Sequence, residues 1–90
     1  MALALIKIKI MPDSPQADLD NIETKTRELL EKQGSKSIKF EREPIAFGLI
    51  AVIAMISWEE EISIDPTIDA IQEFKNVSSA EVIDFRRAIG

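Results

Sequence analysis

The sequence predicts an α+β fold in the order β-α-β-β-α-β, with a four-stranded antiparallel sheet and two helices on one face. Two patterns predict it. Segments in which apolar and charged residues alternate begin the chain and recur in its middle, which is typical of half-buried strands. Apolar residues at three-and-four spacing, each series starting after a polar residue and a proline, indicate two helices. The 90 residues suffice for a single domain, 1–90, with one modest core.

The first strand and the first helix are predicted from the N-terminal third of the chain. Residues 3–10, LALIKIKI, place isoleucines on one face of a strand and lysines on the other, and a proline follows. The first helix is expected over residues 15–32. Ser14 is a suitable N-cap, Pro15 suits the first helical position, and Gly34 is expected to end the helix in a left-handed conformation.

The remaining elements follow from the same signals. Residues 35–43 alternate and carry enough charge for an exposed edge strand. Residues 49–58 form a strand that is apolar on both faces, whereas a central strand of a two-layer fold needs only one apolar face. A helix is expected over residues 66–74 and a last strand over residues 79–87. This order is the ferredoxin-like arrangement, in which the third strand is central, the first lies beside it, and both helices cover one face.

The stretch EPIAFGLIAVIAMISW, residues 43–58, is the longest uncharged part of the chain once its first glutamate is passed. It is shorter than the ~20 residues of a membrane-spanning helix, so a buried strand is the better interpretation and no membrane association is expected. One of its apolar faces lacks an obvious partner within a two-layer fold. Loops or the C-terminal tail cover this open sheet face, or it serves as an interface, including one for self-association.

The composition excludes several functions. The chain has no cysteine and no histidine, which removes thiolate metal sites and the commonest general base, and its three glycines are too far apart for a phosphate-binding loop. We therefore expect no metal, no cofactor and no catalytic residue. The net charge of -5 argues against direct nucleic-acid binding. The N-terminus lacks the features of a signal peptide, which indicates a cytoplasmic protein.

Three blocks in the sequence resemble the archaeal elongation factor 1-beta family: IKIMPDSP at residues 8–15, EPIAFGL at 43–49, and VSSAEVIDFRR at 77–87. Their order and spacing match, and the resemblance covers essentially the whole chain. It implies a ferredoxin-like fold and a guanine-nucleotide exchange factor that promotes GDP release, and GTP reloading, on translation elongation factor 1-alpha. Such a factor acts by protein–protein binding without covalent chemistry.

The resemblance also implies a docking segment. In similar exchange domains, a phenylalanine followed by glycine docks into the partner at the region that receives the aminoacyl end of tRNA. The matching residues are Phe47 and Gly48, preceded by Pro44 and Ala46. Phenylalanine between small residues is commonly a core residue, but aromatic anchors also dominate the energy of interfaces.

A basic residue near the C-terminus is the second implied site. In similar domains a lysine reaches toward the magnesium site of the G protein, and the matching position is Arg87, with Arg86 as the near alternative. A guanidinium there would repel Mg²⁺ and compete for its oxygen ligands. The residue is arginine rather than lysine, and the three residues 88–90 follow it, which changes the geometry of insertion.

Two other functions are compatible with the residues. The first is a ferredoxin-like ligand-sensing or dimerisation module without exchange activity. The second is a small enzyme that uses carboxylates such as Asp84 or Glu81, although nothing pairs them with a catalytic partner. The acidic run at residues 59–61 could steer a basic partner, but a role in solubility is the simpler interpretation.

Overall fold

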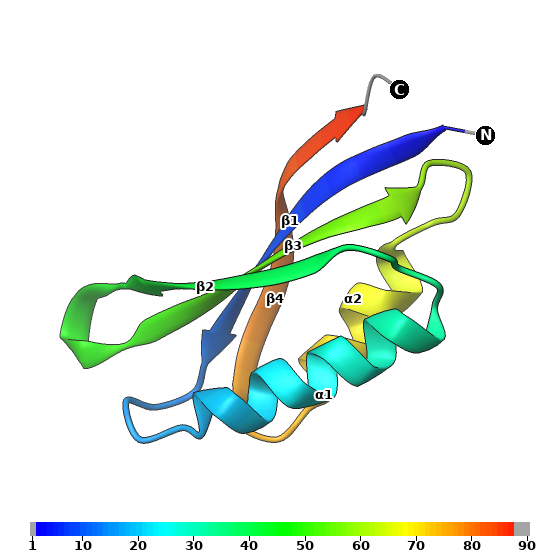
Figure 1. The fold of residues 1–90 in the computed structure, drawn as a ribbon. Helices are drawn as coiled ribbons and strands as arrows, with labels where there is room; N and C mark the ends of the chain where they lie inside the picture. The colour runs from blue at the N-terminus through cyan, green and yellow to red at the C-terminus, as the bar shows by residue number, and fades with distance from the viewer. Residues whose placement is uncertain (1, 88–90) are drawn as a thin grey trace.

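The computed structural model describes residues 2–87, which form one four-stranded sheet packed against two helices (Figure 1). The elements follow in the predicted order β-α-β-β-α-β. Their bounds, in chain order, are β1 Leu3–Pro12, α1 Leu19–Lys32, β2 Ile38–Pro44, β3 Ile50–Glu59, α2 Asp65–Gln72 and β4 Val77–Arg87, with a short 3-10 segment, η1, at Ala46–Gly48.

The strand order in the sheet is β2-β3-β1-β4, and all three neighbouring pairs are antiparallel. The prediction that the third strand is central, with the first strand beside it, is confirmed. So is the edge position of β2. This arrangement is the ferredoxin-like fold. Its central strands, β1 and β3, are ten residues long and run from one end of the molecule to the other.

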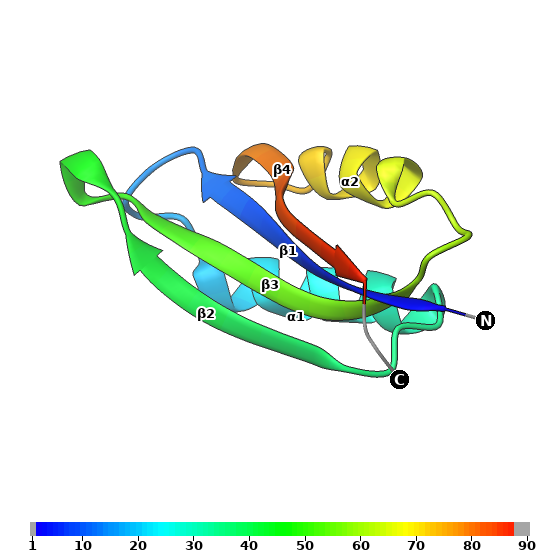
Figure 2. The same ribbon diagram turned by 90° about the horizontal axis from the view of Figure 1, so that it is seen from above.

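One face of the sheet carries the hydrophobic core. Alternate residues of β1 and β3 point to the same side, where the apolar stripes of both helices meet them (Figures 1 and 2). Full burial of each of these aliphatic side chains stabilises the fold by about 1.5–3 kcal/mol relative to exposure. The buried members of this core are Ala4, Ile6, Ile8, Ile10, Ile22, Leu30, Val52, Ala54, Ile56, Trp58, Ile68, Ile71 and Ala80.

Helix α1 begins at Leu19, four residues later than predicted. Asp18 is its N-cap, because its backbone is extended and its Oδ1 accepts the N–H of Asn21 at 3.1 Å. Ser14 and Pro15 instead form a turn that lets the chain pass from the end of β1 to the helical layer. The N-cap is therefore Asp18, and not Ser14 as the sequence had suggested.

The C-terminal end of α1 is as predicted. Gly34 has a φ of +93°, and its N–H donates to the carbonyl of Glu31 at 3.0 Å. The N–H of Ser35 donates to the carbonyl of Leu30, also at 3.0 Å. These two bonds form a Schellman motif, which satisfies carbonyl groups that the helix leaves without a partner.

We expect Asp18→Ala to lower the free energy of unfolding by about 1 kcal/mol, because the Asn21 N–H loses its acceptor. Ser14→Ala is the matched control, since that side chain caps no helix, and it should change the stability by less than about 0.5 kcal/mol. Chemical denaturation of both variants measures this. A larger loss in the Ser14 variant would place the cap where the sequence alone suggested it.

Arg42 ties the edge strand β2 to helix α1. Its Nε donates to Glu23 at 2.9 Å, and its Nη2 donates to Asp20 at 2.5 Å. The hydrogen bond with Glu23 raises the pKa of Arg42 above its ordinary value, and the hydrogen bond with Asp20 adds a smaller contribution in the same direction. Because β2 carries one side of the β2–β3 hairpin, this contact fixes the hairpin relative to the helices.

Candidate functional site

The β2–β3 hairpin ends in a tip that projects from the sheet. Pro44 pairs with Ile50 at the last step of the ladder, so the pairing of β2 with β3 ends there. Beyond this pair, the N–H of Ile45 donates to the carbonyl of Leu49 at 2.7 Å and closes the loop. Figure 1 shows the tip in green at the left, far from the chain termini.

The turn at the tip has an unusual backbone. Phe47 has φ +63° and ψ +29°, Gly48 has φ +76°, and the N–H of Leu49 donates to the carbonyl of Ala46 at 3.3 Å. Positive φ at both central residues, with this hydrogen bond, is the pattern of a type I′ turn. Such turns favour Asn, Asp or Gly at the first central position. Gly48 fits the pattern, whereas Phe47 is a bulky residue in a region that costs about 1–3 kcal/mol.

The ring of Phe47 is also almost fully in solvent, with 94% of the residue exposed. Phe47 is therefore unusual in two ways: its backbone is strained, and its large apolar side chain lies in solvent and not in the core. The other predicted docking residues, Pro44, Ala46 and Gly48, are exposed around it. Exposed aromatic side chains of this kind are common anchors of protein interfaces. That docking role itself stays a prediction.

Arg86 and Arg87 lie at the opposite end of the sheet. Ala4 pairs with Arg87 across β1 and β4, while Leu3 pairs with Glu59 across β1 and β3. The nine residue steps of β3 from the hairpin tip to this end correspond to about 30 Å at the rise of a strand. The molecule is 41 Å long on its longest axis and 22 × 18 Å across. The two predicted sites are thus separated by most of its length.

Both arginines make ion pairs, but of different kinds. Arg87 binds Glu60 with three hydrogen bonds: its Nε lies 3.1 Å from each carboxylate oxygen, and its Nη2 lies 2.6 Å from Oε1. Arg86 makes a single contact, from its Nε to Asp84 at 3.0 Å on its own strand. Arg87 is consequently held in a fork, whereas Arg86 is held loosely on the open face of the sheet.

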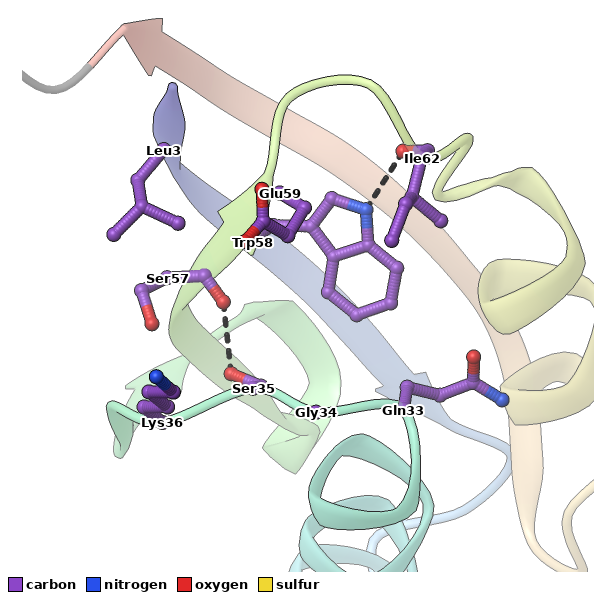
Figure 3. A pocket seen from close by; sticks show the side chains of 9 residues that line it. All are labelled: Leu3, Gln33, Gly34, Ser35, Lys36, Ser57, Trp58, Glu59 and Ile62. Carbon is purple, nitrogen blue, oxygen red and sulfur yellow. Dashed lines mark hydrogen bonds between the residues drawn. The ribbon is translucent and has the colours of Figure 1, made fainter. Parts of the chain in front are cut away.

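The loop that carries Glu60 is fixed by its neighbours. The indole Nε1 of Trp58 donates to the carbonyl of Ile62 at 2.8 Å, as the dashed line in Figure 3 shows. The N–H of Ile62 donates to Glu59 at 3.0 Å, and the N–H of Glu60 donates to Ala2 at 2.9 Å. The Glu60 side chain is only 22% exposed. The sequence showed an acidic run here, but the contact with Arg87 depends on strand register and was not foreseen.

A cavity of about 240 Å³ lies beside this loop (Figure 3). Trp58 and Ile62 form one wall, and the loop after α1 forms the other, where the Ser35 hydroxyl donates to the carbonyl of Ser57 at 2.8 Å. The Ser35 hydroxyl thus joins the loop after α1 to β3, and the Trp58 indole joins β3 to the loop that follows it. The cavity therefore has a structural explanation: it lies where two connections meet over the end of β3.

On the open face of the sheet, the apolar residues of β3 are flanked by charged residues of the neighbouring strands. Ile53 is 6% exposed although no helix covers it. It lies between Lys9 of β1 and Glu41 of β2 in the ladder. Met55 lies in the same way between Lys7 of β1 and Lys39 of β2. Long charged side chains cover apolar neighbours with their aliphatic stems while their ends stay in water. Self-association through this face stays a prediction.

A hollow of about 290 Å³ on the same face surrounds Met55. Its rim carries Lys7, Lys39 and Arg86, with Asp84 beside them. Asp84 is engaged with Arg86, and Glu81, the other carboxylate considered for catalysis, pairs in register with a lysine of β1. This arrangement gives neither carboxylate the partner that acid–base catalysis needs.

Within residues 2–87 no group of three or more acidic, histidine or cysteine side chains is placed to hold a metal ion. No helix in this part of the chain is long and apolar enough to cross a membrane. The residues that follow Arg87, on which the geometry of insertion also depends, lie outside the described part of the chain.

Comparison with solved structures shows the fold. The ACT domain of GTP pyrophosphokinase from Chlorobium tepidum superposes with a TM-score of 0.58 at 14% sequence identity, covering 88% of this chain and 96% of the other. A solution structure of the same domain gives a TM-score of 0.57 at 15% identity, covering 89% and 85%. At this level of identity the likeness concerns the ferredoxin-like architecture alone.

Comparison with known sequences shows the family. The model of the EF-1 guanine nucleotide exchange domain matches residues 5–88. Proteins named elongation factor 1-beta are similar over most of their length: one from Methanococcus maripaludis is 39% identical, with 93% of this chain and 96% of the relative covered. The proteins from Methanocaldococcus jannaschii and Thermococcus gammatolerans are each 40% identical, covering 93% and 83% of this chain and 96% and 84% of the relatives. The chain therefore belongs to the family of EF-1 guanine nucleotide exchange domains.

Proposed function

We propose that this protein promotes the release of GDP from translation elongation factor 1-alpha and so allows GTP to reload. The observation that carries the proposal is the match to the exchange-domain family across residues 5–88. The shape of the molecule supports it, because an exposed phenylalanine and a pair of arginines stand at opposite ends of a four-stranded sheet. Translation takes place in the cytoplasm, which is where we place the protein.

In this proposal the two ends have different tasks. Phe47 docks into the partner at the region that receives the aminoacyl end of tRNA, and the exposed residues around it complete that contact. Arg87, with Arg86 as the alternative, approaches the magnesium and phosphate site about 30 Å away along the sheet. A positive charge there weakens the hold on Mg²⁺ and on the GDP phosphates.

The energetics of exchange need no covalent step. The factor must bind the nucleotide-free partner more tightly than the nucleotide-bound one, and this coupling is reciprocal: GDP weakens binding of the factor by the same ratio. Binding residues and charges supply this difference, which suits a chain without histidine or cysteine. The proposed partner is a protein, and we propose no direct contact with nucleic acid.

The test is stopped-flow release of a fluorescent GDP analogue from elongation factor 1-alpha. We expect the release rate to rise with the concentration of this protein and then saturate, as excess unlabelled GDP prevents rebinding. No acceleration at saturating protein would refute the exchange function. Sedimentation at micromolar concentration would then separate the alternatives: a dimer would favour a dimerisation module and a monomer a ligand-sensing one.

A further inference from the structure

We propose that Glu60 is a restraining residue for exchange: it holds the guanidinium of Arg87 in an ion pair that must open before Arg87 can act on the nucleotide site. This inference rests on the proposed function and adds a residue to it. Its basis is the three hydrogen bonds between the two side chains, with distances of 2.6 to 3.1 Å.

The pair joins a half-buried carboxylate, on a loop with a hydrogen-bonded backbone, to a largely exposed arginine. Glu60 is 22% exposed, and its loop is held by the bond from Glu60 N–H to Ala2 and by the Trp58 indole bond to Ile62 (Figure 3). Arg87 is 74% exposed at the end of an edge strand. When the pair opens, the arginine is therefore the member that moves, while the carboxylate stays in its loop.

The ion pair also hides the charge that the proposed mechanism uses. A guanidinium whose donors face a carboxylate presents almost no net charge to a cation beyond it, because the two opposite charges nearly cancel. A bidentate arginine–carboxylate contact also occupies the donors that phosphate or carboxylate oxygens of the partner would take. Glu60 thus competes with the partner for the same face of Arg87.

Arg86 makes a useful comparison, because its guanidinium has one carboxylate contact where that of Arg87 has three hydrogen bonds. It has one contact, to Asp84 on its own strand, and it is 76% exposed. Asp84 lies in β4, paired with Lys7 in the ladder, and within residues 2–87 the other nitrogens of Arg86 are left without a carboxylate contact. The restraint therefore concerns Arg87 in particular, and a variant of Glu60 should act only while Arg87 is present.

The first experiment measures GDP release at saturating protein for wild type, Glu60→Gln, Arg87→Ala and the double variant. Glutamine keeps the shape of the side chain and removes its charge. Because exposed ion pairs are weak, we expect Glu60→Gln to accelerate release by about two- to fivefold. In the Arg87→Ala background the same change should give no gain.

Glu61→Gln is the matched control. It removes the same charge from the same loop, and Glu61 is exposed. Its release rate should equal that of wild type. A gain in the Glu61 variant equal to that of Glu60→Gln would show an effect of net charge alone and would overturn the proposal. So would an unchanged or slower rate in Glu60→Gln, or an equal gain without Arg87.

A second measurement concerns the ion pair in the protein alone. By NMR, we expect the Nε–H of Arg87 to exchange with water several times faster in Glu60→Gln than in wild type, and at the wild-type rate in Glu61→Gln. If wild type fails to accelerate GDP release, the proposed function is refuted, while this measurement still decides whether the pair forms. Equal exchange of the Nε–H in wild type and Glu60→Gln would refute the pair itself.

Discussion

Phe47→Ala is expected to weaken binding to nucleotide-free elongation factor 1-alpha by about 30-fold or more. A central aromatic anchor contributes at least about 2 kcal/mol when it fills a pocket, which corresponds to that ratio of dissociation constants. The release rate at saturating protein should fall much less, because the docking contact is far from the nucleotide. Titration of the two proteins by calorimetry, together with the concentration dependence of GDP release, separates the two effects.

The stability of the variants distinguishes a docking role from a structural one. Phe47 is almost fully exposed and strained, so its ring contributes little to the core. Phe47→Asn places a residue that the turn favours, and it should leave the free energy of unfolding unchanged or raise it by up to about 1 kcal/mol. Docking should be lost in this variant as well.

Val82→Ala serves as the control for the loss of an exposed apolar side chain. Val82 is partly exposed in the middle of β4, away from the hairpin tip, and its variant should bind normally. If Phe47→Ala and Phe47→Asn both bind like wild type, Phe47 is not the anchor. That result would also refute the assignment of Pro44, Ala46 and Gly48 to the docking surface.

Arg87→Ala is expected to slow GDP release strongly and to weaken binding of the partner only slightly, the reverse of the effect of Phe47→Ala. The release rate at saturating protein should fall by about 10- to 100-fold, since a hydrogen bond to a charged group contributes about 1.5–3 kcal/mol and this one would act at the nucleotide site. The dissociation constant of the complex should change by less. Stopped-flow release at several protein concentrations yields both quantities from one set of traces.

Arg86→Ala provides the comparison that decides between the two arginines. The resemblance to similar exchange domains matches Arg87, and we expect the Arg86 variant to retain most of the activity. If Arg86→Ala is the slower variant, the assignments of the two residues must be exchanged. If both variants release GDP as wild type does, the charge at this end of the sheet is not what drives release.

Much of the fold could be predicted because its signals are local. Alternation in residues 3–10 set the buried face of β1, and the structure has that face in the core. The apolar run at residues 49–58 identified a buried strand, and the β-α-β-β-α-β order placed that strand at the centre of the sheet. Gly34 marked the end of α1 through a backbone conformation that other residues avoid.

The predictions that failed or were incomplete concern competition between signals or contacts distant in sequence. Ser14 is a suitable N-cap by its residue type, but Asp18 caps the helix, which begins four residues later than predicted. The cover over Ile53 comes from lysine and glutamate stems on neighbouring strands, which strand order determines. Neither outcome can be obtained from residue periodicity alone.

The sequence by itself determined the order of elements, the two central strands, the absence of cysteine and histidine, and the family, because all of these depend on local pattern or on residue identity. The tertiary structure decided that Phe47 stands in a strained turn in solvent, that the arginines lie at the other end of the sheet, and that Glu60 holds one of them. Each of these depends on strand register and backbone conformation, which bring together residues as far apart as Glu60 and Arg87.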